Sequence, residues 1–199
     1  VKIITTGEGG MAVTNNHVIA KKMELLRAHG ITRDTKLMTK PKDGPWFYQQ
    51  IDLGFNYRLT DIQAALGISQ IKRIDKFINK RQEIAKRYNV ALKELPITLP
   101  FQHTNCLSSF HLYIIRVSRE ESPISQKLLF EKLRHEGIEV NLHYIPVHFH
   151  PFYQEMGFKL GDFPESEHYY QEAISLPIFP SLKQSQQEHV INIIKKLFK

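Results

Sequence analysis

A long apolar stripe in the middle of the chain most constrains its fold. Thr60 and Gln63 have the spacing of a capping box, with Thr60 as the N-cap of a helix and Gln63 at its third position. Apolar residues then recur at helical spacing until Pro96 and Pro100 end the pattern. The stripe consists of Ile62, Ala65, Leu66, Ile68, Ile71, Ile74, Ile78, Ile84 and Tyr88. We therefore expect a helix to about Leu95, interrupted or bent on the way, with this stripe packed in the core.

Predicted strands and helices alternate in the second half of the chain, and a change of composition after Pro96 indicates a second domain. Upstream, Asn15 or Asn16 can cap a helix that ends near Gly30, and residues 31–52 form a turn-rich loop. We expect strands over 110–117 and 138–144, and helices over 125–135, over 163–173 and from a cap at Ser185 with Glu188. This order predicts an α/β or α+β architecture.

The first residues combine a lysine with a tight glycine turn. Lys2 precedes Gly7, Gly9 and Gly10, which allow positive φ angles and close backbone approach to another group. A surface hairpin, in which residues 2–6 pair with residues 11–14, explains these residues equally well. The turn has the spacing of neither nucleotide-binding glycine fingerprint.

A second candidate site immediately precedes the Thr60 helix. Backbone amides at a helix start, beside Asn56 and Arg58, suit a phosphate or a carboxylate. The alternative is that Arg58 pairs with a carboxylate of the chain and that Asn56 caps a turn.

A third candidate contains three histidines, His143, His148 and His150. Their spacing matches no standard zinc signature, and neither a cysteine nor a nearby acidic residue completes a ligand set, so we predict no metal. A polar loop and a ligand-contacting segment both remain open. We assign no role to the aromatic residues Trp46, Phe47 and Tyr48, since these side chains could cover a ligand or pack against the second domain. His150 likewise receives no role.

Composition limits the class of protein. A formal net charge of +7 indicates anionic partners, either nucleic acid or phosphorylated small molecules. The basic residues are scattered over predicted helix surfaces without a dense block, so we predict no nucleic-acid partner. No apolar run reaches the length of a membrane span. Because Cys106 is the single cysteine, a reducing, cytoplasmic setting fits the chain best.

Four segments occur in an order that resembles the DegT/DnrJ family of sugar-nucleotide aminotransferases, which use pyridoxal phosphate (PLP). They are VKIITTGEGGMAVTNN, GFNYRLTDIQAALGISQIKRID, NLHYIPVHFHPFY and ISLPIFPSL. The resemblance implies that Lys2 carries the cofactor as a Schiff base and that Asn56 binds its phosphate in the neighbouring subunit's site, with Arg58 helping to shape that interface. It also implies that His143 and Tyr144 contact the sugar nucleotide, with His148 as a weaker candidate.

The resemblance further implies part of a fold-type I PLP-dependent aminotransferase. Residues 1–95 would end the large cofactor-binding domain, and residues 96–199 would form the small α+β domain. The implied reaction transfers an amino group from glutamate to the C4 keto group of a UDP-linked 4-keto-6-deoxy-N-acetylhexosamine, as in pseudaminic acid biosynthesis. The implied assembly is a homodimer with shared active sites.

Since the family's lysine lies near the middle of a longer chain, a chain that opens on Val1 inside this motif is expected to be a C-terminal piece. It would lack the phosphate loop, the aromatic residue that stacks on the cofactor and the aspartate that holds its ring nitrogen. We therefore expect little or no activity from it alone. The alternative is a non-catalytic module that binds a partner chain through the small domain and the dimer surface.

Overall fold

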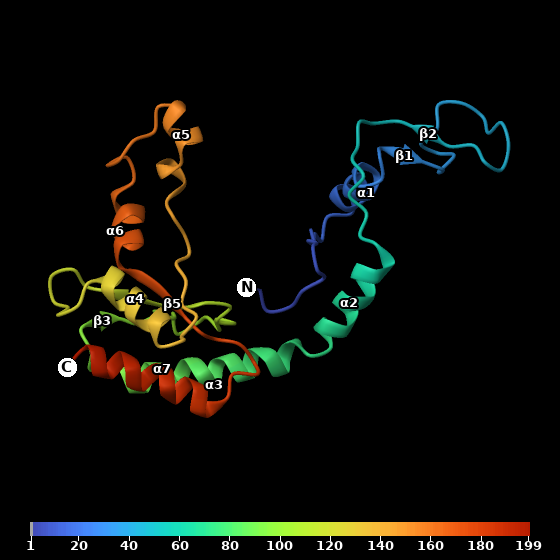
Figure 1. The fold of residues 1–199 in the computed structure, drawn as a ribbon. Coiled ribbons are helices and arrows are strands. Elements are labelled where there is room, and N and C mark those ends of the chain that lie inside the picture. The colour runs from blue at the N-terminus through green and yellow to red at the C-terminus, as the bar shows by residue number, and fades with distance from the viewer. Residues whose placement is uncertain (1) are drawn as a thin grey trace. The chain divides into compact units, whose positions relative to one another are not determined.

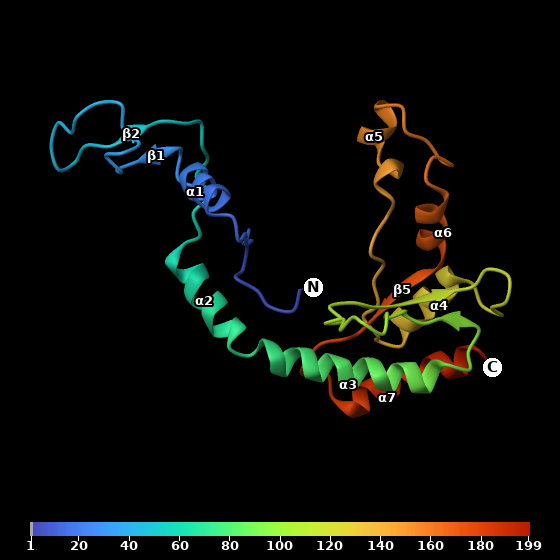
Figure 2. The same cartoon turned by 180° about the vertical axis from the view of Figure 1, so that it is seen from behind.

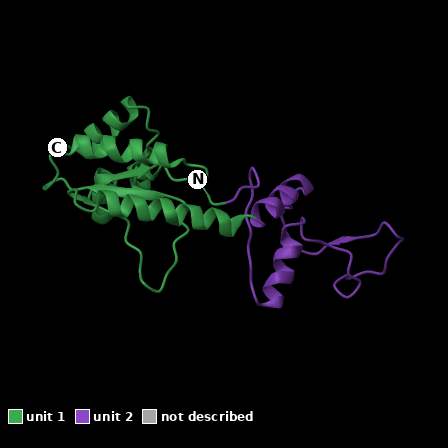
Figure 3. Ribbon diagram, turned by 90° about the horizontal axis from the view of Figure 1, so that it is seen from below, with its two compact units in different colours: residues 1–3, 73–199 green, residues 4–72 purple. Residues whose placement is uncertain are grey.

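A computed structural model describes residues 2–199, which divide into two units (Figure 3). The C-terminal unit contains residues 73–199 together with the first residues up to Ile3, and the N-terminal unit contains residues 4–72. The division falls at Lys72 and Arg73, whereas we predicted a domain boundary near residue 95. The reason is that helix α3 (Ile74–Leu92) buries its apolar face in the core of the C-terminal unit.

A three-stranded antiparallel sheet forms the centre of the C-terminal unit, in the order β3-β4-β5 (Figure 1). The strands are β3 (Ile97–Thr98), β4 (Tyr113–Val117) and β5 (Ala173–Leu176). Tyr113 lies opposite Leu176 and Ile115 opposite Ile174. The sequence predicted β4 within residues 110–117, but we did not anticipate β3 or β5.

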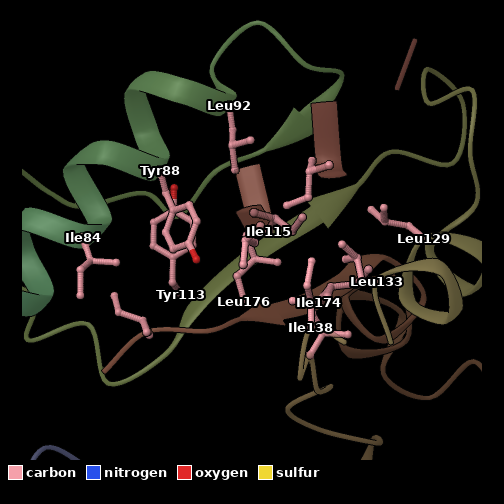
Figure 4. Packing of buried hydrophobic residues seen from close by; sticks show 14 of the residues in the cluster. Ile84, Tyr88, Leu92, Tyr113, Ile115, Leu129, Leu133, Ile138, Ile174 and Leu176 are labelled. Carbon is pink, nitrogen blue, oxygen red and sulfur yellow. The ribbon is translucent and has the colours of Figure 1, made fainter. Parts of the chain in front are cut away.

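The core lies between β4, β5 and the helices that cover them. Tyr113 and Ile115 alternate with half-buried residues along β4, as expected for a strand with one face in a core. Tyr88 and Leu92 of α3 point toward this face, and the rings of Tyr88 and Tyr113 lie 4.9 Å apart (Figure 4). Full burial of each such side chain contributes roughly 1.5–3 kcal/mol.

Two further helices complete this core. Helix α4 (Gln126–His135) begins at Ser125, whose hydroxyl accepts the Leu128 amide at 3.3 Å, and it ends before Gly137, where φ is +74°. Both ends match the prediction. Helix α7 (Gln184–Leu197) lies beside α3 (Figure 2). It begins at Lys183, where Gln186 supplies the capping side chain, rather than at the predicted cap Ser185.

An extended arm, residues 143–172, leads away from the sheet and returns to it (Figures 1 and 2). It contains a short 3-10 helix η1 (Val147–Phe149), helix α5 (Pro151–Glu155) and helix α6 (Pro164–Glu172). Helix α6 confirms the predicted helix with a proline in its first turn. The predicted strand over 138–144 is reduced to one bridge, between Asn141 and Ser175.

The N-terminal unit consists of short elements joined by loops. Helix α1 (His17–Leu26) is capped by Asn16, one of the two predicted candidates, and a two-residue ladder joins β1 (Ile31–Thr32) to β2 (Gln49–Gln50). Helix α2 (Asp61–Ile71) follows. The predicted core packing of the α2 stripe is not formed, because no residue of α2 is buried and Ile62 is 84% exposed.

The capping box at the start of α2 is formed as the sequence predicted. The Thr60 hydroxyl accepts the Gln63 amide at 3.3 Å, and the Gln63 carboxamide accepts the Thr60 amide at 3.1 Å. We expect Thr60→Ala to weaken the first turn by about 1 kcal/mol, since an N-cap acceptor is lost. Amide exchange of Gln63 should then accelerate about fivefold, whereas Thr60→Ser should keep the slow rate. Equal exchange in all three proteins would contradict this role of Thr60.

Candidate functional site

The glycine turn after Lys2 rests on the start of α2. The Gln63 side chain donates from Nε2 to the Glu8 carbonyl at 2.8 Å, while its Oε1 accepts from Thr60. A Cβ added to Gly9 would lie 3.3 Å from the Leu59 side chain. Within the N-terminal unit, residues 7–10 therefore lie next to the start of α2, the helix that follows Asn56 and Arg58. The alternative hairpin is not present, because neither residues 2–6 nor residues 11–14 form a strand.

Close backbone packing positions the segment before α2. Gly54 lies against the backbone of Leu26 to Gly30, and a Cβ on Gly54 would come within 2.6 Å of the His29 carbonyl carbon. The Phe55 amide donates to the Leu26 carbonyl at 2.7 Å. Only glycine fits this approach, which fixes the backbone that leads to Asn56.

Asn56 and Arg58 both lie at the surface. Within residues 2–199, neither side chain has a hydrogen-bond or ion-pair partner, so the predicted carboxylate partner of Arg58 and the predicted turn cap at Asn56 are not formed there. Two groups that bind anions thus remain available just before the N-terminal end of a helix.

Lys2 belongs to the C-terminal unit and is exposed there. Burial lowers the pKa of His111, and the nearby positive charges of Lys2, Arg81 and His143 lower it further. Arg81 also holds the backbone before His111 in place, since its Nη1 donates to the Phe110 and Ile178 carbonyls, each at 2.9 Å. The side chains of Lys2, His111 and His143 therefore lie near one another.

His143 and Tyr144 open the arm. His143 Nδ1 lies 2.7 Å from the Ser175 hydroxyl of β5, and burial lowers the pKa of the His143 imidazole. Tyr144 is 66% exposed, and its ring meets the His143 ring edge-on at 4.8 Å between centroids. Both residues can present polar groups to a ligand from the surface of the C-terminal unit.

His148 differs from these residues because it is buried. Its Nε2 lies 2.9 Å from Glu167 Oε1, and the same oxygen accepts the Gly161 amide at 2.7 Å. The Phe163 ring lies 4.9 Å from the imidazole. The burial of His148 favours a structural role inside the arm over the substrate contact that we predicted.

The described residues contain no cluster of three or more histidine, cysteine or acidic side chains suited to a metal ion. His150 is exposed, so the three histidines of this segment do not converge on one point. None of the described helices combines the length and the hydropathy needed to cross a bilayer.

We expect acid to lower the stability of the arm by protonating Glu167. Burial opposes ionisation of this carboxyl, but hydrogen bonds from His148 and Gly161 outweigh burial and lower its pKa below the ordinary 4.5. A lowered pKa stabilises the folded state above pH 4.5, and this contribution is lost as the pH falls further through the folded-state pKa. We expect Glu167→Gln to flatten the acid dependence of thermal unfolding, followed by circular dichroism. Glu165→Gln, an exposed change on the same helix, should retain the wild-type dependence; a Glu167→Gln profile as steep as wild type would contradict the assignment.

Sequence reasoning missed His111, Ser175 and Glu167. The partners of Ser175 and Glu167 lie 32 and 19 residues away in the chain, beyond any local spacing rule. Had β5 been predicted, the alternation of its side chains between the two faces of the sheet would have been the one sequence signal for Ser175. A cavity of about 800 Å³ between the end of β4, the start of α4 and α6 contains none of the predicted site residues.

Comparison with known proteins identifies relatives along almost the whole chain. Residues 1–195 match the DegT/DnrJ/EryC1/StrS aminotransferase family. The spore coat polysaccharide biosynthesis protein SpsC of Bacillus subtilis is 34% identical over 201 residues, which cover 100% of this chain and 51% of SpsC. An uncharacterised protein of Methanocaldococcus jannaschii is 39% identical over 198 residues, 98% of this chain and 51% of that protein.

The similar solved structures are also those of aminotransferases. Helicobacter pylori PseC, an aminotransferase involved in the biosynthesis of pseudoaminic acid, is 32% identical with a TM-score of 0.84, and the match covers 100% of this chain and 51% of PseC. The putative sugar aminotransferase Spr1654 of Streptococcus pneumoniae, in its PMP form, is 28% identical with a TM-score of 0.85, covering 99% of this chain and 50% of Spr1654. The chain thus spans about half the length of the proteins it matches.

Proposed function

Because the chain belongs to the DegT/DnrJ/EryC1/StrS aminotransferase family, we propose that it supplies one part of a PLP-dependent sugar aminotransferase. Its fold is the α/β architecture of fold-type I aminotransferases, of which it corresponds to about half a chain. The observation that carries the proposal is the contact of the glycine turn after Lys2 with the start of α2, made by Gln63.

The residues present fit the cofactor by their chemistry. Lys2 offers an exposed primary amine with no ion-pair partner among residues 2–199. Asn56 and Arg58 offer unpaired donors before a helix N-terminus, which suits a phosphate dianion. Lys2 would hold the cofactor aldehyde covalently, and Asn56 would hold the phosphate, with Arg58 beside it. We propose that Asn56 and Arg58 do so in the site of a partner subunit, within a homodimer.

PLP, when bound, supplies an electron sink for charge that develops on the carbon losing a proton. The chain's own contribution is the proton carrier, since the Lys2 amine can accept a proton from one carbon and return it to another. Lysine can do so at neutral pH when its surroundings favour the unprotonated amine.

The proposed reaction moves an amino group from glutamate to the C4 keto group of a UDP-linked 4-keto-6-deoxy-N-acetylhexosamine. The likeness to PseC supports this substrate class. The net charge of +7 also suits a substrate that carries a diphosphate. His143 and Tyr144 would contact the sugar nucleotide, because both are accessible from the surface of the C-terminal unit.

Cofactor trapping tests the proposal. The chain is mixed with PLP and reduced with borohydride, and the labelled peptides are mapped by mass spectrometry. We expect label concentrated on the peptide that contains Lys2. Label spread evenly over the lysines of the chain would contradict cofactor binding by this piece. Little or no transamination is expected from the chain alone, so sustained turnover by the isolated chain would contradict the need for the residues of the other half.

A second candidate is a non-catalytic module that binds a partner chain. It is favoured by the apolar stripe of α2, where Ile62, Ile68 and Ile71 are all more than half exposed. A surface of this kind indicates a protein contact. Failure to trap PLP, together with a stable fold and a specific protein partner, would favour this candidate over the enzyme.

A further inference from the structure

Two side chains outside the predicted site hold His143 in place. The first is Ser175, in the middle of β5. Its neighbours Ile174 and Leu176 point into the core (Figure 4), so by strand alternation the Ser175 side chain lies on the other face of the sheet. There its hydroxyl lies 2.7 Å from His143 Nδ1. The Ser175 amide also donates to the Asn141 carbonyl at 2.7 Å, which anchors the strand to the residues just before His143.

The second side chain is Tyr169, on helix α6. Its hydroxyl donates to the His143 carbonyl at 3.3 Å. The same helix carries Glu167, which binds His148 inside the arm, and Glu172, whose carboxylate lies 3.7 Å from Arg116 of β4. Helix α6 is therefore bonded both to η1, elsewhere in the arm, and to β4 of the sheet. Because α6 is held at these two points, the Tyr169 hydroxyl can keep the backbone of His143 in place.

The hydrogen bond to Ser175 determines which ring nitrogen of His143 carries a proton. Ser175 is 5% exposed, and a buried hydroxyl proton without an acceptor is costly. Within the described residues, His143 Nδ1 is the recorded partner of that hydroxyl. The hydroxyl therefore donates to Nδ1, which leaves the single ring proton of a neutral imidazole on Nε2.

We propose that Ser175 and Tyr169 are positioning residues that hold His143 as a neutral imidazole whose Nε2–H is a hydrogen-bond donor for an oxygen atom of the sugar nucleotide. The choice of ligand rests on the proposed function, whereas the arrangement of the three side chains does not. Burial independently favours the neutral form, because it lowers the pKa of His143.

NMR of the isotope-labelled chain tests the arrangement without any ligand. The nitrogen shifts of the His143 imidazole distinguish an Nε2–H ring from an Nδ1–H ring, and we expect Nε2–H in the wild type. Ser175→Ala should alter these shifts, whereas Ser175→Thr keeps a hydroxyl and should retain them. Ser181→Ala removes an exposed hydroxyl nearby in the sequence and serves as the matched control. Wild-type His143 shifts in a folded Ser175→Ala chain would overturn the proposal.

A titration with UDP tests the ligand. We expect UDP to perturb the His143 signals of the wild type, and Ser175→Ala to weaken binding roughly three- to tenfold, the effect of one misplaced hydrogen bond. Tyr169→Phe removes one hydroxyl and keeps the ring, so it tests the same positioning should Ser175→Ala fail to fold. Unchanged UDP affinity in folded variants of both residues would overturn their role. Absence of UDP binding in the wild type would count against the proposed function, while the NMR result would still decide the arrangement around His143.

Discussion

We expect Lys2→Arg to abolish covalent capture of PLP by this chain. A guanidinium remains protonated at any accessible pH and does not form the imine that a lysine amine forms with an aldehyde. The substitution keeps the positive charge that acts on His111, so its effect reports the lost amine rather than a lost charge. Borohydride reduction followed by mass spectrometry should recover essentially no label on the N-terminal peptide.

The matched control is Lys21→Arg. Lys21 is also an exposed lysine of this chain, and it forms a surface ion pair with Glu24 at 2.7 Å. Its replacement should leave the labelling of Lys2 unchanged. If the N-terminal region of the Lys2→Arg chain still acquired the wild-type amount of label, Lys2 could not be the cofactor lysine.

The second large effect is on stability. We expect Ile115→Ala to lower the unfolding free energy of the C-terminal unit by about 4 kcal/mol, since a fully buried large aliphatic side chain is cut back in a packed core. Ile115 is 0% exposed in the central strand of the sheet, opposite Ile174. The rest of the buried core includes residues of α3, α4, β5 and α7, so its side chains cannot close the space by a single small movement.

Urea unfolding followed by far-ultraviolet circular dichroism measures this loss as a lower midpoint. Ile62→Ala is the control, because Ile62 is 84% exposed and the same substitution there should change the midpoint little. Equal midpoints for Ile115→Ala and wild type would show that Ile115 does not lie in the core.

Local signals predicted the helix starts. Thr60 caps its helix as the sequence predicted, and Asn16 caps its helix as one of two predicted candidates, because a capping side chain bonds to amides only two or three residues away. The predicted helix over 125–135 begins at Ser125, which serves as its cap. The start of α7 was misplaced by about two residues, since Lys183 and Gln186 form the cap in place of Ser185 and Glu188.

Tertiary context determined what the local signals could not. Residues 138–144 have the composition of a strand, yet they form only the bridge from Asn141 to Ser175 before the chain leaves the sheet. The glycine turn and its flanks look like a hairpin, but Gln63, 55 residues from Glu8, binds the turn instead. The apolar stripe of α2 has the period of a core helix, but periodicity does not reveal whether another part of the protein packs against the stripe.

The candidate site shows the same limit. Residue types and the family resemblance pointed to Lys2, Asn56, Arg58, His143 and Tyr144, which lie at the surface or at its edge. They ranked His148 below His143 but gave both the same kind of role, since both are histidines of one short segment. Ser175 and Glu167 separate them, because one histidine faces a strand hydroxyl and the other faces a buried carboxylate.

The side chain of Gln63 couples the folding of the first turn of α2 to the ordering of the glycine loop. One end of its carboxamide closes the first turn of α2, and the other end binds the Glu8 carbonyl. Fraying of that helical turn would release the glycine loop, and ordering of the loop would in turn favour the helix. By thermodynamic reciprocity, any anion that stabilises the helix start would order the loop, and a group bound next to the loop would increase affinity for the anion by the same factor. A single neutral amide can thus couple binding at the start of α2 to binding beside the glycine loop.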